Sequence, residues 1–107
     1  MKNKYLKYLK IYDKPDNIII ENEKGLFIGE RLDNETVAVH IVTTAKRYRT
    51  ITEEDLEDKL KLLKTRFKFA LAPIKPQNID AINLVQSIGF KHLTDGDEMY
   101  HIYGREL

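Results

Sequence analysis

The middle of the chain places the tightest constraint on the fold, because a strand, a helix and a second strand follow one another there. Residues 36–43 are rich in β-branched side chains, which favour a pleated strand. Thr52 is a suitable N-cap for the helix, and Asp55 completes a weak capping box. Residues 67–72 form a second apolar run, which Pro73 ends. Two strands joined through a helix pair in parallel by a right-handed crossover, so this segment predicts a mixed sheet with a helix packed on it.

The predicted central helix carries an apolar stripe and an ordered charge pattern. Acidic residues occupy its first turn, where the helix dipole is positive, and lysines gather toward its end. The stripe consists of Leu56, Leu60, Leu63 and Phe67. At i,i+4 spacing we expect two ion pairs, each worth about 0.2–0.5 kcal/mol: Asp55 with Lys59, and Glu57 with Lys61.

The rest of the chain adds further elements on both sides of this unit. A helix and a hairpin precede it, and a helix and a second hairpin follow it. The expected segments are a helix over 3–12, strands over 18–21 and 26–29, a helix from Asn78 to Gly89, and strands over 90–94 and 99–103 around the turn Asp95-Gly96. Gly89 is expected to end the second of these helices as its C′ glycine, with Phe90 folding back over the last turn. This order predicts one α/β domain over residues 1–107, of the α+β type, with a mixed, mostly antiparallel sheet and helices packed on it.

Charge and composition exclude several classes of function. The net charge of +1 does not indicate a nucleic-acid partner. The chain contains no cysteine, which excludes disulfides and thiol catalysis and removes the thiolate ligands of zinc, and we expect no metal site. No apolar run reaches the roughly 20 residues that span a bilayer, so we expect a soluble protein with no membrane partner.

The last predicted helix carries a spaced set of residues that resembles a known motif. The set is Asn78, Ala81, Leu84, Val85, Ile88, Gly89 and Phe90. Its spacing is similar to the late motif of the GNAT N-acetyltransferase family, Asn-x-x-Ala-x-x-Leu-Tyr-x-x-hydrophobic-Gly-Phe, and the element order over residues 18–105 resembles the same family. The resemblance implies a GNAT-like fold that uses acetyl-CoA. The plan is also similar to the shortened GNAT-like proteins of short-tailed phages, which are virion or head-morphogenesis components.

Two features depart from the family pattern. The family's pyrophosphate loop has the form Arg/Gln-x-x-Gly-x-Gly/Ala, whereas this chain has Thr52 and Glu54 at the small-residue positions if Arg49 begins the loop. Basic residues in the loop 46–49 compensate only in part for the acidic helix start. Val85 replaces a tyrosine that protonates the leaving thiolate, and valine cannot donate a proton. These departures imply that no cofactor binds; if acetyl-CoA does bind, the candidate residues are Arg49, Thr50, Ile51, Thr52 and Asn78.

Three side chains are candidates for proton transfer if the chain is an enzyme. His40 lies in the middle of a predicted strand and could act as a general base, but a half-buried histidine satisfied by a neighbour is the preferred interpretation. Tyr100 and Tyr103 could replace the missing tyrosine as the acid. His92 and His101 fall on the two arms of the last hairpin, where they could face each other.

Three functions are compatible with these features. The preferred one is a non-catalytic GNAT-like module for structure, assembly or interaction, as in a phage virion, which binds a protein partner or a second copy of itself. The first alternative is an active acetyl-CoA-dependent N-acyltransferase with an atypical pyrophosphate loop. The second alternative is a small phage inhibitor of a host factor. We expect a cytoplasmic or virion-associated location.

Overall fold

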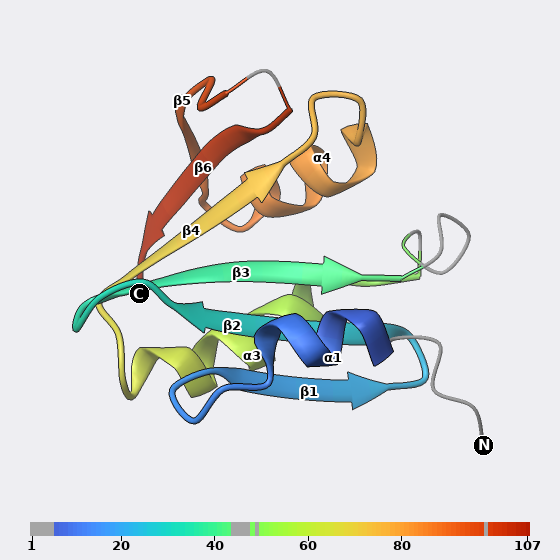
Figure 1. The fold of residues 1–107 in the computed structure, drawn as a ribbon. Helices are drawn as coiled ribbons and strands as arrows, with labels where there is room; N and C mark the ends of the chain where they lie inside the picture. Colours follow the sequence, from blue (N-terminus) through green and yellow to red (C-terminus); the bar gives the residue numbers. More distant parts are fainter. Residues whose placement is uncertain (1–5, 44–47, 49, 98) are drawn as a thin grey trace.

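The computed structural model describes residues 6–43, 48, 50–97 and 99–107, and it contains a six-stranded sheet (Figure 1). The strands lie in the order β1-β2-β3-β4-β6-β5. Strands β3 and β4 are parallel and the other neighbouring pairs are antiparallel, which confirms the predicted mixed, mostly antiparallel sheet. The bounds are β1 Ile18–Asn22, β2 Gly25–Arg31, β3 Thr36–Val42, β4 Phe69–Ile74, β5 Lys91–Thr94 and β6 His101–Glu106.

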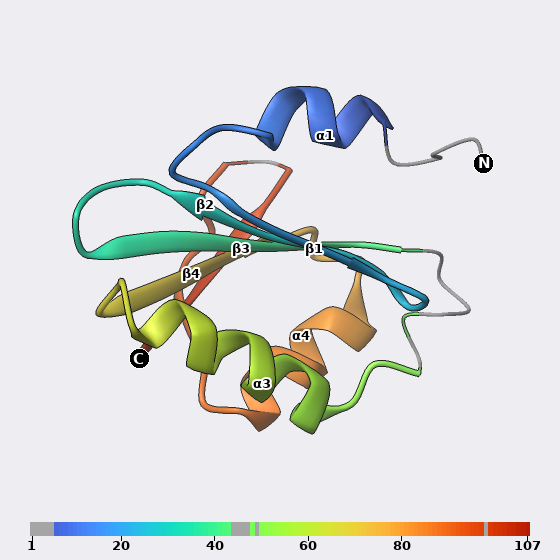
Figure 2. The ribbon, with the colours of Figure 1, turned by 90° about the horizontal axis from the view of Figure 1, so that it is seen from below.

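Helices cover both faces of the sheet. One face carries α1 (Leu6–Tyr12), and the opposite face carries α3 (Glu53–Lys64) and α4 (Ile79–Ser87) (Figure 2). The first residues of the helix predicted over 3–12 lie outside the described residues. The described part, α1, ends at Tyr12 as predicted. Across the described ranges, no helix combines the length and the apolar composition that crossing a membrane requires.

Apolar side chains form a core on each side of the sheet. On the α3 and α4 side, a large cluster joins the sheet to both helices through residues such as Phe27, Leu60 and Val85. On the α1 side, Leu26 and Ile28 pack beneath residues of α1. Successive residues of a strand point to opposite faces, so β2 contributes to both cores and is buried between the helix layers.

Helix α3 begins and packs as its sequence predicts. Thr52 Oγ1 accepts the Asp55 N–H at 3.1 Å, and Asp55 Oδ2 accepts the Thr52 N–H at 2.9 Å, which completes the capping box. The predicted stripe is buried against the sheet. A side chain at Gly29 of β2 would place its Cβ 2.9 Å from Leu63 Cδ2, so the glycine allows α3 to approach the strand closely.

The ion pairs predicted along α3 are wrong. Asp55 Oδ2 lies 2.5 Å from Nζ of Lys24, which is in the turn between β1 and β2. Glu57 Oε1 lies 2.5 Å from Nη1 of Arg105 on β6. The two acids flank the buried stripe of α3 on either side and are only half-buried, so each lies within reach of a cation from a neighbouring element.

Strand β4 differs from its prediction in position. It spans Phe69–Ile74 instead of 67–72, and it includes Pro73, which was expected to end it. Its parallel pairing with β3 covers only the first part of each strand, from Thr36↔Phe69 to Ala38↔Leu71. Beyond that point the two strands diverge (Figure 1), so Pro73 lies where β4 is paired on one side alone. A residue without an N–H is tolerated there because the ladder on the β3 side has already ended.

The end of α4 follows the predicted glycine stop. Gly89 has φ +96°, a conformation that favours glycine. The Gly89 N–H donates to the Gln86 carbonyl at 3.1 Å, and the Phe90 N–H donates to the Val85 carbonyl at 3.0 Å. This pair of bonds is the Schellman pattern, and the buried Phe90 ring closes over the last turn as expected.

The last hairpin has a longer connection than its sequence predicts. Residues 95–100 join β5 to β6, whereas the predicted strands 90–94 and 99–103 left only residues 95–98 between them, around Asp95-Gly96. Strand β6 extends to Glu106 because it pairs with the whole of β4. The pairing of β5 with β6 changes register between His92 and Thr94, which marks a β-bulge.

Candidate functional site

The divergence of β3 and β4 opens a pocket in the middle of the sheet. Its volume is ≈ 320 Å³, within the usual range for a small-molecule site. Residues from both faces line it, because the opening passes between the two strands. We call it the inter-strand pocket; its lining includes Tyr12 of α1, His40 of β3, Ala72 of β4 and Val85 of α4, together with Tyr48, which lies between β3 and α3, and Tyr100, which lies between β5 and β6.

Beside this pocket, the facing edges of β3 and β4 do not pair with each other. Residues 39–42 of β3 pair with β2, and residues 72–74 of β4 pair with β6, but these two stretches do not pair with each other. Each stretch therefore presents the backbone groups of its other edge to the pocket. Such an edge offers hydrogen bonds to an extended ligand that carries amide groups, as in β-strand addition.

His40 is the best-placed base in the inter-strand pocket. Its Nε2 lies 3.1 Å from Oε1 of Glu30, and its ring centroid lies 5.1 Å from that of Tyr12. The side chain is 20% exposed, so it is half-buried and still accessible. When neutral His40 donates its Nε2–H to the Glu30 carboxylate, the Nδ1 atom holds the lone pair that can accept a proton.

Tyrosines supply the proton donors of this pocket. Burial and then the nearby Glu30 carboxylate raise the pKa of Tyr12. Burial, with a smaller effect of Asp80, raises the pKa of Tyr48 to about 12. Both phenols therefore keep their protons at neutral pH. Tyr100 lines the pocket beside them, as one of the candidate acids.

The structure separates the predicted site residues into two groups. His40 and Tyr100 meet in the inter-strand pocket. Tyr103 lies in the core instead, only 5% exposed, with its ring against His92. Sequence reasoning missed Glu30 and Tyr48. Tyr48 was assigned only to a basic loop, and the pairing of Glu30 with a histidine on the next strand required the register of β2 and β3.

The start of α3 is occupied by side chains of the protein itself. Thr52 and Asp55 cap each other, and Lys24 Nζ contacts Asp55 and also the Thr50 carbonyl at 3.1 Å. The predicted cofactor residues Thr50, Ile51 and Thr52 lie at this helix start, whereas Arg49 lies outside the described residues. Asn78 also has a structural role, since its side-chain oxygen accepts the Ala81 N–H at 3.2 Å as the N-cap of α4.

Asp55→Asn is expected to lower stability at neutral pH and to have less effect in acid. The contact with Lys24 and then the Thr52 N–H hold the pKa of Asp55 below its ordinary value. The unfolded state therefore binds more protons as the pH falls below about 4, and the contribution of the carboxylate is lost as the pH drops through the folded-state pKa. Urea unfolding at several pH values measures the free energy of unfolding of wild type and variant. The difference between the two free energies should become smaller in acid.

Asp58→Asn is the matched control for this measurement. Asp58 lies on the same helix with its side chain 59% exposed and only a 4.0 Å contact to Lys61. Its effect on stability should be small at every pH. A difference between wild type and Asp55→Asn that stays constant from neutral to acid pH would contradict the assigned role of the Lys24 contact.

A second cluster of functional side chains lies outside the lining of the inter-strand pocket. His92 and His101 do face each other across the last hairpin, and Asp95 joins them. No metal site was expected from the sequence, although the spacing His92-x-x-Asp95 was an available signal for one. The cluster offers two imidazoles and one carboxylate to a cation.

Comparison with known proteins identifies the fold. No protein-family model matches the sequence, and no curated protein matches it. A domain from Methanocaldococcus jannaschii is similar in structure, with a TM-score of 0.74 and 23% identity over 98% of this chain and 77% of that chain. The Campylobacter jejuni N-acetyltransferase PseH, in complex with acetyl coenzyme A, has a TM-score of 0.71 and 11% identity over 96% and 77% of the two chains.

A third solved structure gives the same result. A GNAT family acetyltransferase from Elizabethkingia anophelis, with acetyl-CoA bound, has a TM-score of 0.67 and 14% identity over 94% of this chain and 82% of that chain. The low identities make these likenesses of fold. The chain therefore has the GNAT fold that the resemblance in its last helix implied.

Proposed function

We propose that this GNAT-fold chain binds acetyl-CoA in the inter-strand pocket and transfers the acetyl group to a primary amine. The observation that carries the proposal is the divergence of β3 and β4, which leaves two unpaired strand edges facing a pocket that contains His40 and Tyr100. Two of the similar structures, PseH and the Elizabethkingia anophelis acetyltransferase, contain acetyl-CoA. A base, acids and a donor site in one pocket meet the geometric requirements of acyl transfer.

The two parts of acetyl-CoA fit this chain unequally. The pantetheine arm carries amides, which suit the unpaired edges of residues 39–42 and 72–74. The pyrophosphate is anionic, and it would meet the acidic first turn of α3, whose Asp55 and Thr52 already cap each other. A helix start normally attracts anions, but here its own carboxylates oppose one. We therefore expect the arm, rather than the pyrophosphate, to supply the affinity.

The pocket residues supply both proton transfers of the reaction. His40 accepts the proton of the attacking amine, and Glu30 holds its ring in place. The amine nitrogen forms a bond to the thioester carbon as the carbon–sulfur bond breaks. The leaving sulfur takes a proton from Tyr100, because burial raises the pKa of Tyr48 to about 12 and makes that phenol a poor proton donor. Tyr100 thus takes the role of the family tyrosine, whose position Val85 occupies, and solvent restores its proton.

Calorimetric titration tests this proposal with two acyl donors. Acetyl-CoA and S-acetylpantetheine are expected to bind the protein with similar affinity, because the pyrophosphate adds little. The double variant Glu53→Gln/Glu54→Gln removes two negative charges from the start of α3. It is expected to tighten acetyl-CoA binding severalfold and to leave S-acetylpantetheine binding unchanged, since only the first ligand carries phosphates.

Glu21→Gln provides the matched control, because Glu21 is an exposed acid on β1, outside the inter-strand pocket lining. It should leave the affinities for both donors unchanged. If neither acetyl-CoA nor S-acetylpantetheine binds, the proposal is overturned. Acetyl-CoA binding far tighter than S-acetylpantetheine binding would overturn the assignment of the affinity to the arm.

A non-catalytic role is the second candidate function. The acidic start of α3 and the valine at position 85 favour it, because both remove features on which the family chemistry depends. In this case the fold serves as an assembly or interaction module, for example in a phage virion. The molar mass of the purified protein, measured by light scattering, tests this role. A defined oligomer without donor binding supports this role, whereas a monomer that binds acetyl-CoA argues against it.

A further inference from the structure

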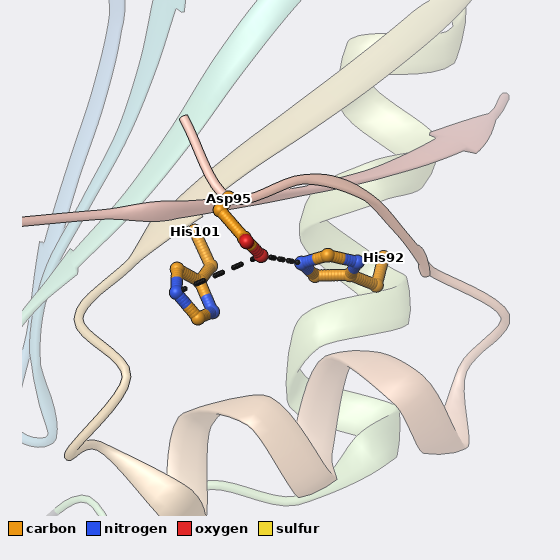
Figure 3. Close-up of side chains that lie close together, drawn as sticks. All are labelled: His92, Asp95 and His101. Carbon is orange, nitrogen blue, oxygen red and sulfur yellow. Dashed lines mark ion pairs between the residues drawn. The ribbon is translucent and has the colours of Figure 1, made fainter. Parts of the chain in front are cut away.

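Three side chains that can ligate a metal converge at the end of the β5–β6 hairpin. Asp95 Oδ1 lies 3.1 Å from His92 Nε2 and 3.8 Å from His101 Nε2 (Figure 3). One ligand atom from each residue lies within 4.8 Å of the other two. We call these three residues the hairpin triad.

The β-bulge brings the hairpin triad to one face of the sheet. His92 and Asp95 are three residues apart, an odd spacing that would place them on opposite faces of a regular strand. The register shifts from His92↔Tyr103 to Thr94↔Ile102, which inserts one extra residue between them. Continuing the shifted register places Asp95 opposite His101. Bulges are known to redirect side chains in this way, and here the result is three ligands on the same side.

We propose that the hairpin triad binds a divalent transition ion of the Zn²⁺ class. Two imidazoles and one carboxylate are a common ligand set for zinc, and ligands 2.0–2.1 Å from a tetrahedral ion lie about 3.3–3.5 Å apart. The two separations from Asp95, 3.1 Å and 3.8 Å, bracket that value, and all three ligand atoms lie within 4.8 Å of one another, so rotations of the exposed side chains can bring them to a common ion. Asp95 is 79% exposed, which leaves room for water as a fourth ligand.

Metal binding would join three parts of the hairpin. His92 belongs to β5, Asp95 begins the connection, and His101 begins β6. The same connection ends at Tyr100, which lines the inter-strand pocket. The bound ion would therefore hold in place the segment that carries one of the candidate acids; this consequence, unlike the metal site itself, rests on the proposed function.

The test is titration of the untagged protein with Zn²⁺, followed by calorimetry and by NMR of the imidazole ring signals. The chain has three histidines and no cysteine, so each ring can be followed separately. We expect saturable binding of one ion, with the signals of His92 and His101 shifting together and that of His40 unchanged. His92→Ala, His101→Ala and Asp95→Asn should each lower the Zn²⁺ affinity at least about tenfold.

His40→Ala is the matched control, because it removes the histidine that lies outside the hairpin triad. It should bind Zn²⁺ as the wild type does. Thermal unfolding of each variant without metal checks that it folds. Zn²⁺ should raise the melting temperature of the wild type and of His40→Ala, but not that of the three variants of the hairpin triad. Absence of binding, or binding that survives loss of both triad histidines, would overturn the site. Neither result depends on whether acetyl-CoA binds.

Discussion

Replacing His40 by alanine is expected to lower the turnover number for acetyl transfer by about 10²–10⁴-fold, the usual contribution of a general base. His40 is the histidine of the inter-strand pocket, and Glu30 lies 3.1 Å from its Nε2. The substitution removes the proton acceptor and leaves the unpaired strand edges intact. We therefore expect the affinity for the acyl donor to change little, so that the loss appears in the rate. Release of free thiol, followed with saturating acetyl-CoA and a panel of primary amines, measures it.

Glu30→Gln separates the role of positioning from that of the base. The amide can still contact His40, but it accepts the Nε2–H less strongly than a carboxylate does and so holds the ring less firmly. We expect a smaller loss of turnover than for His40→Ala, in kcat rather than in KM. Circular dichroism of both variants checks the fold. Wild-type turnover in His40→Ala would show that another group or a water molecule accepts the proton.

Replacing Leu63 by alanine is expected to lower the free energy of unfolding by about 2–5 kcal/mol, the usual range for a buried leucine. Leu63 is fully buried on α3, where it packs against β2 at Gly29. Truncation removes apolar contacts and leaves a cavity that the neighbouring helix and strand cannot fill without moving. Urea unfolding followed by circular dichroism measures the change.

Leu62→Ala is a closely matched control for this experiment. The same substitution is made one residue away on the same helix, but the Leu62 side chain is 52% exposed. We expect a change within about 0.5 kcal/mol, as for other surface substitutions. Equal effects of the two substitutions would contradict the packing of α3 against the sheet. The packing of α3 also bears on the proposed donor site, because Leu56 of the same helix lines the inter-strand pocket.

Local patterns predicted the elements with strong chemical signals at their ends. The capping box at Thr52 and the glycine stop at Gly89 are both confirmed, because each is formed by residues within one turn of the helix end. The same holds for the parallel crossover between β3 and β4, which follows from placing a helix between two strands. Strand β4 was misplaced, because Pro73 ends a strand only when the strand is paired on both sides.

The candidate site was predicted less completely than the fold. His40 and Tyr100 were identified as candidates, and the structure brings both to the inter-strand pocket. Glu30 and Tyr48 were missed, because the role of Glu30 depends on the register of β2 and β3, and that of Tyr48 on its tertiary position between β3 and α3. Tyr103 lies in the core because pairing of the whole of β4 with β6 draws it there.

The sequence by itself determined the order of elements, their caps and the α3 stripe, since these depend on interactions between residues close in the chain. Only the tertiary structure decided which charges pair, where the sheet opens and which ligands converge. Asp55 contacts Lys24 rather than Lys59, and the bulge in β5 turns His92 toward Asp95. These outcomes depend on distances between separate elements, and such distances are set by packing and strand register rather than by local spacing.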